Sequence, residues 1–512
     1  MYLLTEIIVA IIIIIIAIWI IWRKRKLSMF KHWGIPGPEP NFWTGNLEEL
    51  NSNKNMEKYL IDKYGKVVGF YLGPRPFLIV ADPELLKIIQ VKEFKNFVNK
   101  DLIFPDLGIP LKCITESIET VKDDKWRNSR HCLNAAFSTG KIKNMVKTIH
   151  EAIDIFMKKM EENDSKPFDV MDTCRRLTFD VICRTTCEIS TNIQNNEKNL
   201  FTDSLEHVFQ FGTSEMLDRI SMCFPELEPI PTRLRWLKDS IRTFFNLPSA
   251  GIISKTCENI IKSRKETKQN PAANLLQLML NASQNNENED SKGQSEVKNK
   301  AITLSDESII GNTFLFLVGG YETIGSTLGY CLYTLAKNFD VQEKVRDEIN
   351  SHLYEKEDVE YSDLANLQYL DQVIAEVSRL FPVYFPGVSR VSSTEFRYKD
   401  IVIPKNSVVA VPLWYLHRSP DYWSSPEKFM PERFSAENRS TIDPFVYQPF
   451  GAGPRICLGM RLAQTVIKLA LVRLLKSYRL EKTDDDETLE LNYQIVFVRP
   501  QKSLFIRAVP IE

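Results

Sequence analysis

Several patterns that often carry chemistry are missing from this 512-residue sequence. Its nine cysteines include no C-x-x-C pair, and none of its six histidines stands in a metal-binding spacing such as H-E-x-x-H. The stretch from Gly320 to Thr327 has the glycine spacing of a phosphate loop, but Ser326 occupies the lysine position. Residues 451–453 begin like a dinucleotide fingerprint, yet Ile456 replaces the third glycine. These absences argue against a structural zinc site and against a nucleotide, flavin or nicotinamide site within the chain.

An excess of charge of either sign is missing as well. The 65 basic and 66 acidic residues give a net charge of −1, so nothing in the balance favours nucleic acid as a partner. The composition, with 44% hydrophobic and 26% charged residues, is typical of a globular chain with a large core. Partners therefore have to be inferred from local features.

The first clear feature is an apolar run from Ile7 to Trp22, which contains six consecutive isoleucines and reaches membrane-spanning length when residues 1–4 are added. A cleaved signal peptide is the alternative, but a positive leading region and a small-residue cleavage site are both lacking. The basic residues 23–26 follow the run, and only Glu6 is charged before it. The positive-inside rule then predicts a single-pass anchor with a lumenal N-terminus and a cytosolic remainder.

This topology organises the chain into an anchor (residues 1–22), a basic stop-transfer and proline-rich hinge (23–40) and one large domain (41–512). The hinge contains G-I-P-G-P-E-P, in which the prolines restrict φ and disfavour helix. In a cytosolic domain the cysteines should be reduced, and the glycosylation sequons at Asn281 and Asn438 should be unoccupied.

The stretch F-G-A-G-P-R-I-C-L-G, residues 450–459, places Cys457 in a glycine-rich loop before an amphipathic helix. Glycines at 451, 453 and 459 allow positive φ or close approach to a flat ligand. The unpaired N–H groups at the start of the helix should favour a thiolate. A single cysteine in a reducing compartment is otherwise more often a small buried apolar side chain.

The neighbours of Cys457 favour the first interpretation. Phe450, Gly453, Arg455, Cys457 and Gly459 fit F-x-x-G-x-R-x-C-x-G, and here the chain resembles the cytochrome P-450 family of haem-thiolate monooxygenases. The resemblance implies haem b as cofactor, Cys457 as the ligand of its iron, and Arg455 as a contact of a haem propionate. It extends over nearly the whole chain from Pro36 onward.

Further haem contacts are implied by the same resemblance. Trp126 and Arg130 lie at i and i+4 of a predicted helix and match a W-x-x-x-R pattern that contacts haem propionates. Arg390 matches another propionate contact. By the residues alone, Trp126 and Arg130 are more often a surface or cation–π pair.

A long helical pattern from Ser305 to about Lys337 contains two adjacent glycines, Gly319 and Gly320, each costing about 1 kcal/mol relative to alanine. Close helix–helix contact would explain them. The resemblance instead places Gly319-Gly320-Tyr321-Glu322-Thr323 across the distal haem face, where the glycines make room for dioxygen. It assigns proton delivery to Glu322 and Thr323.

A structural network is expected from Glu376, Arg379 and Arg433. The first two are spaced i, i+3 in a helix that ends before Pro382, and alone they would be an ordinary surface pair. The resemblance identifies them as the E-x-x-R helix, with Arg433 in the partner segment P-E-R-F, bracing the haem loop through charge-assisted hydrogen bonds.

The expected fold is mainly α with small β-sheets (α+β), the cytochrome P-450 fold preceded by one transmembrane helix. Apart from the helices, the sequence predicts the following local features: a hairpin over 66–80, a long loop over 104–118, a mostly helical lid over 142–268 interrupted by Pro225, Pro229 and Pro231, a surface loop over 283–300, strands over 401–403 and 408–411, and a hairpin of 493–498 with 504–509.

The implied function is a membrane-bound monooxygenase of the microsomal type, closest to the animal clan that oxidises steroids and foreign compounds. Its substrate would be a small apolar molecule such as a steroid, a fatty acid or a xenobiotic. Electrons would come from an NADPH-dependent flavoprotein reductase on the endoplasmic reticulum, with cytochrome b5 as a second candidate donor. Basic residues on the cysteine side would dock the reductase: Arg130, Lys141, Lys143 and Arg461. A haem-thiolate isomerase or dehydratase, and a noncatalytic haem sensor, are the alternatives.

Overall fold

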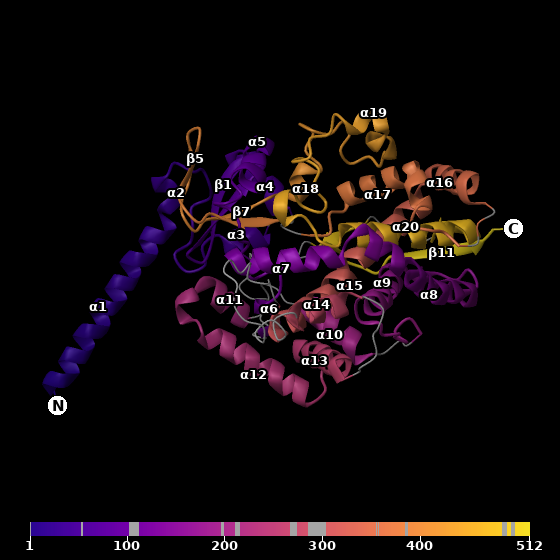
Figure 1. The fold of residues 1–512 in the computed structure, drawn as a ribbon. Coiled ribbons are helices and arrows are strands. Elements are labelled where there is room, and N and C mark those ends of the chain that lie inside the picture. Colours follow the sequence, from indigo (N-terminus) through magenta and orange to yellow (C-terminus); the bar gives the residue numbers. More distant parts are fainter. Residues whose placement is uncertain are drawn as a thin grey trace, which may run out of the picture.

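The computed structural model consists of one large body and a long N-terminal helix, α1 (Tyr2–Leu27), that projects from it (Figure 1). Helix α1 is long and apolar enough to cross a membrane, and no residue of its most apolar window is buried in the described structure. The structure describes residues 2–52, 55–101, 112–195, 199–209, 216–266, 274–284, 304–354, 356, 358–384, 388–483, 489–492 and 497–511.

The body is mostly helical, as predicted. Its α-helices are α2 (Met29–His32), α3 (Leu47–Ser52), α4 (Met56–Tyr64), α5 (Pro83–Lys87), α6 (Lys112–Thr115), α7 (Asp123–Ala136), α8 (Thr139–Asn163), α9 (Val170–Cys187), α10 (Leu200–Phe209), α11 (Met216–Cys223), α12 (Ile230–Phe244), α13 (Ala250–Glu266), α14 (Leu275–Gln284), α15 (Asp306–Lys337), α16 (Phe339–Leu353), α17 (Gln368–Leu380), α18 (Leu413–Leu416), α19 (Ala436–Arg439) and α20 (Met460–Ser477). Short 3-10 or π turns are η1 (Ile88–Lys92), η3 (Pro225–Leu227), η4 (Asp363–Asn366), η5 (Pro431–Phe434) and η6 (Gly453–Arg455).

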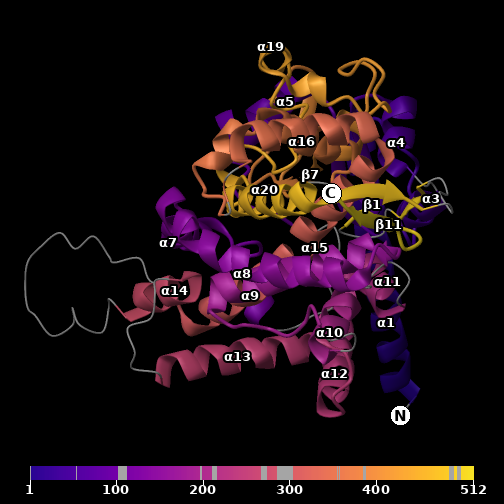
Figure 2. The ribbon, with the colours of Figure 1, turned by 90° about the vertical axis from the view of Figure 1, so that its right-hand side faces the viewer.

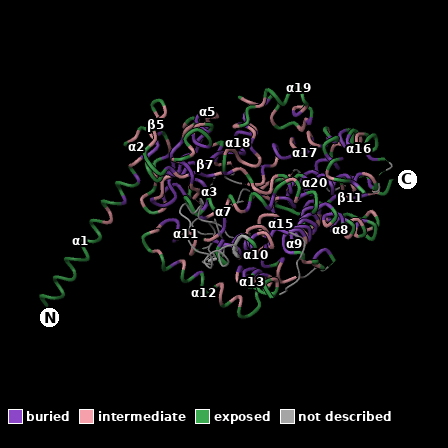
Figure 3. The backbone as a smooth tube through the Cα atoms, viewed as in Figure 1, coloured by how far each residue is buried: buried purple, intermediate pink, exposed green. Residues whose placement is uncertain are grey.

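Helix α15 is the central element of the helical part. It begins where the sequence predicts, because the hydroxyl of Ser305 accepts a hydrogen bond from the N–H of Ser308 at 3.2 Å and caps the first turn. It packs against α9 on one side and against α17 and α20 on the other, and Figure 2 shows α20 and α9 on its opposite sides. The buried residues of Figure 3 are densest around α9 and α15, so the largest core surrounds this helix.

The β-structure is small and lies mainly near the anchor. Strands β1 (Val67–Leu72) and β2 (Arg75–Val80) form the predicted hairpin, and the four-stranded sheet has the order β1-β2-β7-β4, with β7 (Val408–Ala410) and β4 (Ser389–Val391). Strands β5 (Phe396–Tyr398) and β6 (Ile401–Ile403) form a separate hairpin. The proline-rich hinge packs on this sheet, since a Cβ at Gly37 would lie 1.9 Å from the carbonyl oxygen of Gly69.

Three local predictions differ from the structure. Leu504–Val509 does not pair with the run before it: β11 (Phe505–Pro510) pairs with β8 (Tyr478–Lys482) and β3 (Phe168–Asp169), whereas β10 (Arg499–Pro500) pairs with β9 (Leu491–Asn492). Alternation alone predicts a strand but not its partner. Residues 112–115 of the expected 104–118 loop form α6, and Pro231 lies in the first turn of α12, where proline is tolerated. Residues 102–111, 285–300 and 493–496 lie outside the described chain.

Candidate haem-thiolate site

The loop before α20 fixes the position of Cys457 through its backbone. Gly451 and Gly453 have φ of +76° and +73°, a conformation that side chains disfavour. A Cβ at Gly453 would also lie 2.1 Å from the carbonyl oxygen of Gln90. Gly459 has φ of −85° and is the N-cap of α20, so its local backbone does not require glycine. The conformational argument from the sequence is therefore correct for two of the three glycines.

The thiol of Cys457 is accessible but closely surrounded by protein. It is the one exposed cysteine among the eight that the structure describes, and its backbone N–H donates to the carbonyl of Phe450 at 2.9 Å. Burial nevertheless raises the pKa of the thiol. The backbone N–H of Gly459 and the positive charges of Lys100 and Arg130 offset this rise only in part. The net direction is opposite to the expectation from the helix N-terminus alone. A metal ion on the sulfur would supply the missing positive charge and deprotonate the thiol.

Arg455 is held next to this loop by neutral partners. Its guanidinium carbon lies 4.2 Å from the centroid of the Trp126 ring. Its N–H groups donate to the carbonyls of Val98, Ile118 and Val121 at 2.9, 3.2 and 3.3 Å. Burial, with the nearby cations Arg390 and Arg130, lowers the pKa of Arg455 to about 9, and the charge of Glu119 offsets this only in part. The Trp126 ring thus forms a cation–π contact with the guanidinium of Arg455.

Arg390 is a second buried cation without an adequate counter-charge. It is completely buried, and its two Nη atoms donate to the carbonyls of Ser389 and Ala452 at 2.7 and 3.2 Å. Its Nε has no partner among the described residues. Burial lowers the pKa of Arg390 to about 10. The half-buried Arg130, whose pKa is also lowered by burial, interacts with Cys457.

No motif or spacing in the sequence points to Lys100 and Glu119 as residues of this site. The Nζ atom of Lys100 lies 2.8 and 2.9 Å from the two carboxylate oxygens of Glu119. Burial lowers the pKa of Lys100 even so. Glu119 also interacts with Arg390 and Arg455. One carboxylate is therefore the shared counter-charge of three cations: Lys100, Arg390 and Arg455.

This charge balance fits haem b. Its two propionate carboxylates would neutralise Arg390 and Arg455, which share the single carboxylate of Glu119 with Lys100, and a charge without full compensation is costly to bury. Its iron would take the accessible sulfur of Cys457. The residues available to the propionates are those expected from the sequence, namely Trp126, Arg130, Arg390 and Arg455, together with Lys100.

The two glycines of α15 have different surroundings. A Cβ at Gly319 would meet no described atom within 4 Å, whereas a Cβ at Gly320 would lie 2.5 Å from the Ile182 side chain of α9. Gly320 therefore serves helix–helix contact, and Gly319 borders open space. Phe316, one turn earlier, packs in the same apolar cluster as Leu458, which places this part of α15 near the cysteine loop.

Thr323 and Glu322 point to different partners. The hydroxyl of the half-buried Thr323 donates to the carbonyl of Gly319 at 2.7 Å. The carboxylate of Glu322 is fully buried and receives Arg499 Nε at 2.9 Å and Arg175 Nη2 at 3.0 Å, with a second Arg499 contact through Nη2. The structure thus does not bring the carboxylate of Glu322 to the hydroxyl of Thr323.

The partners of Glu322 extend to α10. Arg499 Nη1 donates to Glu206 at 2.8 Å, and the hydroxyl of Tyr321 donates to the same carboxylate at 2.7 Å. Burial raises the pKa of Glu206, but Arg499 and Arg175 outweigh it, and the net direction is downward. No local sequence pattern identifies the members of this network, because Arg175, Glu206 and Arg499 lie far from Glu322 along the chain.

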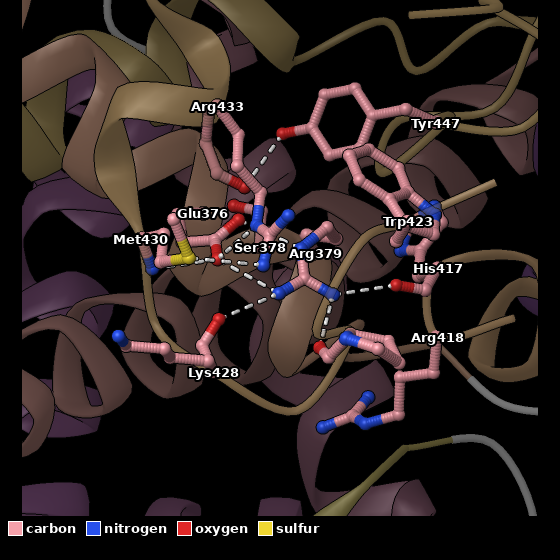
Figure 4. A network of polar contacts seen from close by, with 12 residues as sticks. Glu376, Ser378, Arg379, His417, Arg418, Trp423, Lys428, Met430, Arg433 and Tyr447 are labelled. Atoms are coloured by element: carbon pink, nitrogen blue, oxygen red, sulfur yellow. Dashed lines mark hydrogen bonds and ion pairs between the residues drawn. The ribbon is translucent and has the colours of Figure 1, made fainter. Parts of the chain in front are cut away.

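Glu376, Arg379 and Arg433 form the expected network (Figure 4). Arg379 binds Glu376 through two hydrogen bonds of 2.7 and 2.8 Å, and both side chains are completely buried. Arg433 Nε reaches the same carboxylate at 3.3 Å. Arg379 also donates to the carbonyl of His417, whose ring nitrogen Nε2 accepts the N–H of Gln448, two residues before Phe450 in the cysteine loop.

Comparison with known proteins identifies the family of the chain. The family model described as Cytochrome P450 matches residues 35–508. Cytochrome P450 3A25 of Mus musculus is 33% identical over 500 residues, covering 96% of this chain and 95% of the relative. Cytochrome P450 3A11 of Mus musculus is 34% identical over 499 residues, covering 96% and 94%. Lithocholate 6-beta-hydroxylase of Mesocricetus auratus is 34% identical over 494 residues, again covering 96% and 94%. The chain therefore belongs to the cytochrome P450 family of haem-thiolate monooxygenases, with haem b as its cofactor.

Proposed function

We propose that this enzyme is a membrane-bound monooxygenase that inserts one oxygen atom from O2 into a small apolar substrate, using electrons from a separate reductase. The observation that carries the proposal is the accessible thiol of Cys457 near three buried cations, Lys100, Arg390 and Arg455, that share the one carboxylate of Glu119. Haem b, when bound, supplies oxygen activation and attack on the substrate. Cys457 would hold its iron, and Arg130, Arg390 and Arg455 would hold its carboxylates.

Thr323 and Glu322 would act on protons in different ways. The Thr323 hydroxyl can turn from the carbonyl of Gly319 towards the open space beside that residue, and there accept and donate a proton. Glu322 is bound by Arg499, so proton transfer between Glu322 and Thr323 needs an intervening water or release of the carboxylate from Arg499.

The substrate class is supported by the relatives. One of them is named for 6-beta-hydroxylation of lithocholate, and we propose a steroid or a xenobiotic of similar size as the substrate here, with fatty acids as a further class. The region expected to dock a reductase carries exposed basic residues. Helix α8 packs against α20 and exposes Lys143, and the exposed Arg461 of α20 donates to the hydroxyl of Thr139 in α8 at 3.3 Å. An NADPH-dependent flavoprotein, or cytochrome b5, would dock on this cationic face.

We further propose that α1 spans the endoplasmic reticulum membrane with the N-terminus in the lumen. The sequons provide a test, since Asn281 and Asn438 are both exposed and sterically available to modification. In a cytosolic domain both stay unmodified, and the detection of N-linked sugar at either site would contradict this orientation.

The decisive experiment combines a spectrum with turnover. Reduced wild-type protein treated with carbon monoxide should show the strongly red-shifted band of thiolate ligation, and Cys457→Ser should lose it. The control is Cys132→Ser, since Cys132 is the other cysteine whose side chain is not buried among the eight described ones. Product from a panel of steroids and drug-like compounds should require both O2 and reductase. Product formation without either would favour an isomerase or dehydratase, and a thiolate spectrum with no product from the panel would favour a sensor.

A further inference from the structure

Arg23 stands at the cytosolic end of the apolar helix, yet it is completely buried. The next three residues, Lys24, Arg25 and Lys26, are exposed. A basic residue that only marks the end of a membrane span extends its charge into water or lipid headgroups. The burial of Arg23 therefore indicates a role that its three neighbours do not share.

The guanidinium of Arg23 binds two separate segments of the body. Its Nε donates to the carbonyl of Phe42 at 2.6 Å, and its Nη2 donates to the carbonyls of Trp43 and Cys223, both at 2.7 Å. Its Nη1 pairs with Glu226 at 3.0 Å. Phe42 and Trp43 precede the β1–β2 hairpin, whereas Cys223 ends α11 and Glu226 lies in the η3 turn before α12.

Aromatic rings enclose the same cation. The guanidinium carbon lies 5.4 Å from the ring centroid of Trp19, 5.6 Å from that of Phe42 and 5.1 Å from that of Phe224. Trp19, one helical turn before Arg23, donates its Nε1–H to Glu226 at 3.0 Å. We call Trp19, Arg23, Phe42, Trp43, Phe224 and Glu226 the anchor junction.

The segment bound by the junction continues into an apolar surface. Helix α12 exposes large apolar side chains spaced three and four residues apart, on one face of the helix. They are Ile230, Leu234, Leu237, Ile241 and Phe244. Helices α11, α12 and α1 occupy the same lower side of the molecule in both ribbon views (Figure 1 and Figure 2). The junction is thus placed to hold this face in a fixed relation to α1.

We propose that Arg23 couples the membrane helix to segment 223–226, so that α1 moves as one body with helices α11 and α12, which we call the roof. This inference rests on the proposed insertion of α1 into a bilayer. A change in the tilt of α1, caused for example by bilayer thickness, is then transmitted to the roof. A flexible tether would instead leave the roof unaffected by α1.

The test is hydrogen–deuterium exchange of the full-length haem-loaded protein in phospholipid nanodiscs, without substrate. Arg23→Ala should increase exchange of peptides from 216–244 and 41–46 by about tenfold or more, since the buried hydrogen bonds that close these segments are lost. Glu226→Gln keeps the three carbonyl contacts of Arg23 and should give a smaller increase in 216–244. The matched control, Lys24→Ala, should leave both regions at wild-type rates.

Equal rates for Arg23→Ala and wild type in 216–244 would overturn the proposal, as would equal increases for Arg23→Ala and Lys24→Ala. If Arg23→Ala cannot be loaded with haem, Glu226→Gln decides, and wild-type exchange in that variant refutes the coupling. Resistance of the wild type to alkaline carbonate extraction reports membrane insertion separately. Failure of that assay would remove the membrane proposal and leave the exchange result on the junction intact.

Discussion

Arg379 offers the most direct test of how the haem loop is supported. Its guanidinium is completely buried and donates five hydrogen bonds: two to Glu376 and one each to the carbonyls of His417, Pro426 and Lys428. Arg379→Ala removes all five donors. It leaves the buried carboxylate of Glu376 with only the longer contact to Arg433 and the N–H of Met430.

Breaking a buried ion pair by removing one partner costs about 3–5 kcal/mol, and the orphaned carbonyls add to it. A domain has roughly 5–15 kcal/mol of stability in total, so the loss takes about a fifth of it or more. The loop is affected directly, because His417, which receives one of these hydrogen bonds, accepts the N–H of Gln448 just before the cysteine loop. We therefore expect Arg379→Ala to lose haem incorporation.

The assay is the amount of reduced, carbon-monoxide-binding protein per milligram, together with the midpoint of urea unfolding. Arg433→Ala should lie between wild type and Arg379→Ala, since its contact with Glu376 is longer at 3.3 Å. Arg397→Ala is the control, because Arg397 is 67% exposed and pairs only with nearby Glu395; its effect should stay within about 0.5 kcal/mol. Normal haem content in Arg379→Ala would refute this account of the network.

Three further predictions concern the same site. Burial, with Arg379 and Arg418, lowers the pKa of His417 to about 3. As the pH falls below about 6.5, His417 is therefore protonated in the unfolded chain before it is protonated in the folded protein. The free energy of unfolding then decreases by about 1.4 kcal/mol per pH unit between about pH 6.5 and 3. Urea unfolding at about pH 6.5 and 5 should therefore show a loss about 2 kcal/mol larger in wild type than in His417→Gln, and equal losses would contradict the buried neutral ring. Gly453→Ala should abolish haem loading because of its φ of +73° and the 2.1 Å approach to backbone, whereas Gly459→Ala, with 3.9 Å to the nearest atom, should load normally; similar haem contents would be inconsistent with this geometry. Arg499→Gln removes the cation shared by the buried carboxylate of Glu322 and the half-buried carboxylate of Glu206. This variant should release several-fold more peroxide per NADPH consumed than the exposed control Arg479→Gln, while unchanged peroxide release would separate the network from proton delivery.

Much of the helical framework follows from local sequence. The cap at Ser305, the β1–β2 hairpin around residues 73–74 and the end of α17 before Pro382 each depend on residues within a few positions of one another. Local steric and hydrogen-bonding rules decide such features, and the structure agrees with them. The cysteine loop is of the same kind, because Gly451 and Gly453 set their own backbone.

The features that could not be predicted from the sequence depend on contacts between residues far apart in the chain. Leu504–Val509 is a strand as predicted, but its partners are chosen by the core and lie in β8 and β3. Arg499 binds Glu322 across 177 positions. The net rise in the pKa of the Cys457 thiol reflects how much protein surrounds the sulfur, which no helix-terminus argument includes.

The unequal surroundings of Gly319 and Gly320 also predict which of the two positions can vary. Alanine at 319 would find no described atom within 4 Å and would add roughly 1 kcal/mol of helix propensity, so this site is open to exchange during evolution or redesign. Alanine at 320 would collide with Ile182 unless that residue became smaller at the same time. The first position could thus be used to trim the volume offered to a substrate one methyl group at a time, while the second should covary with a residue of α9.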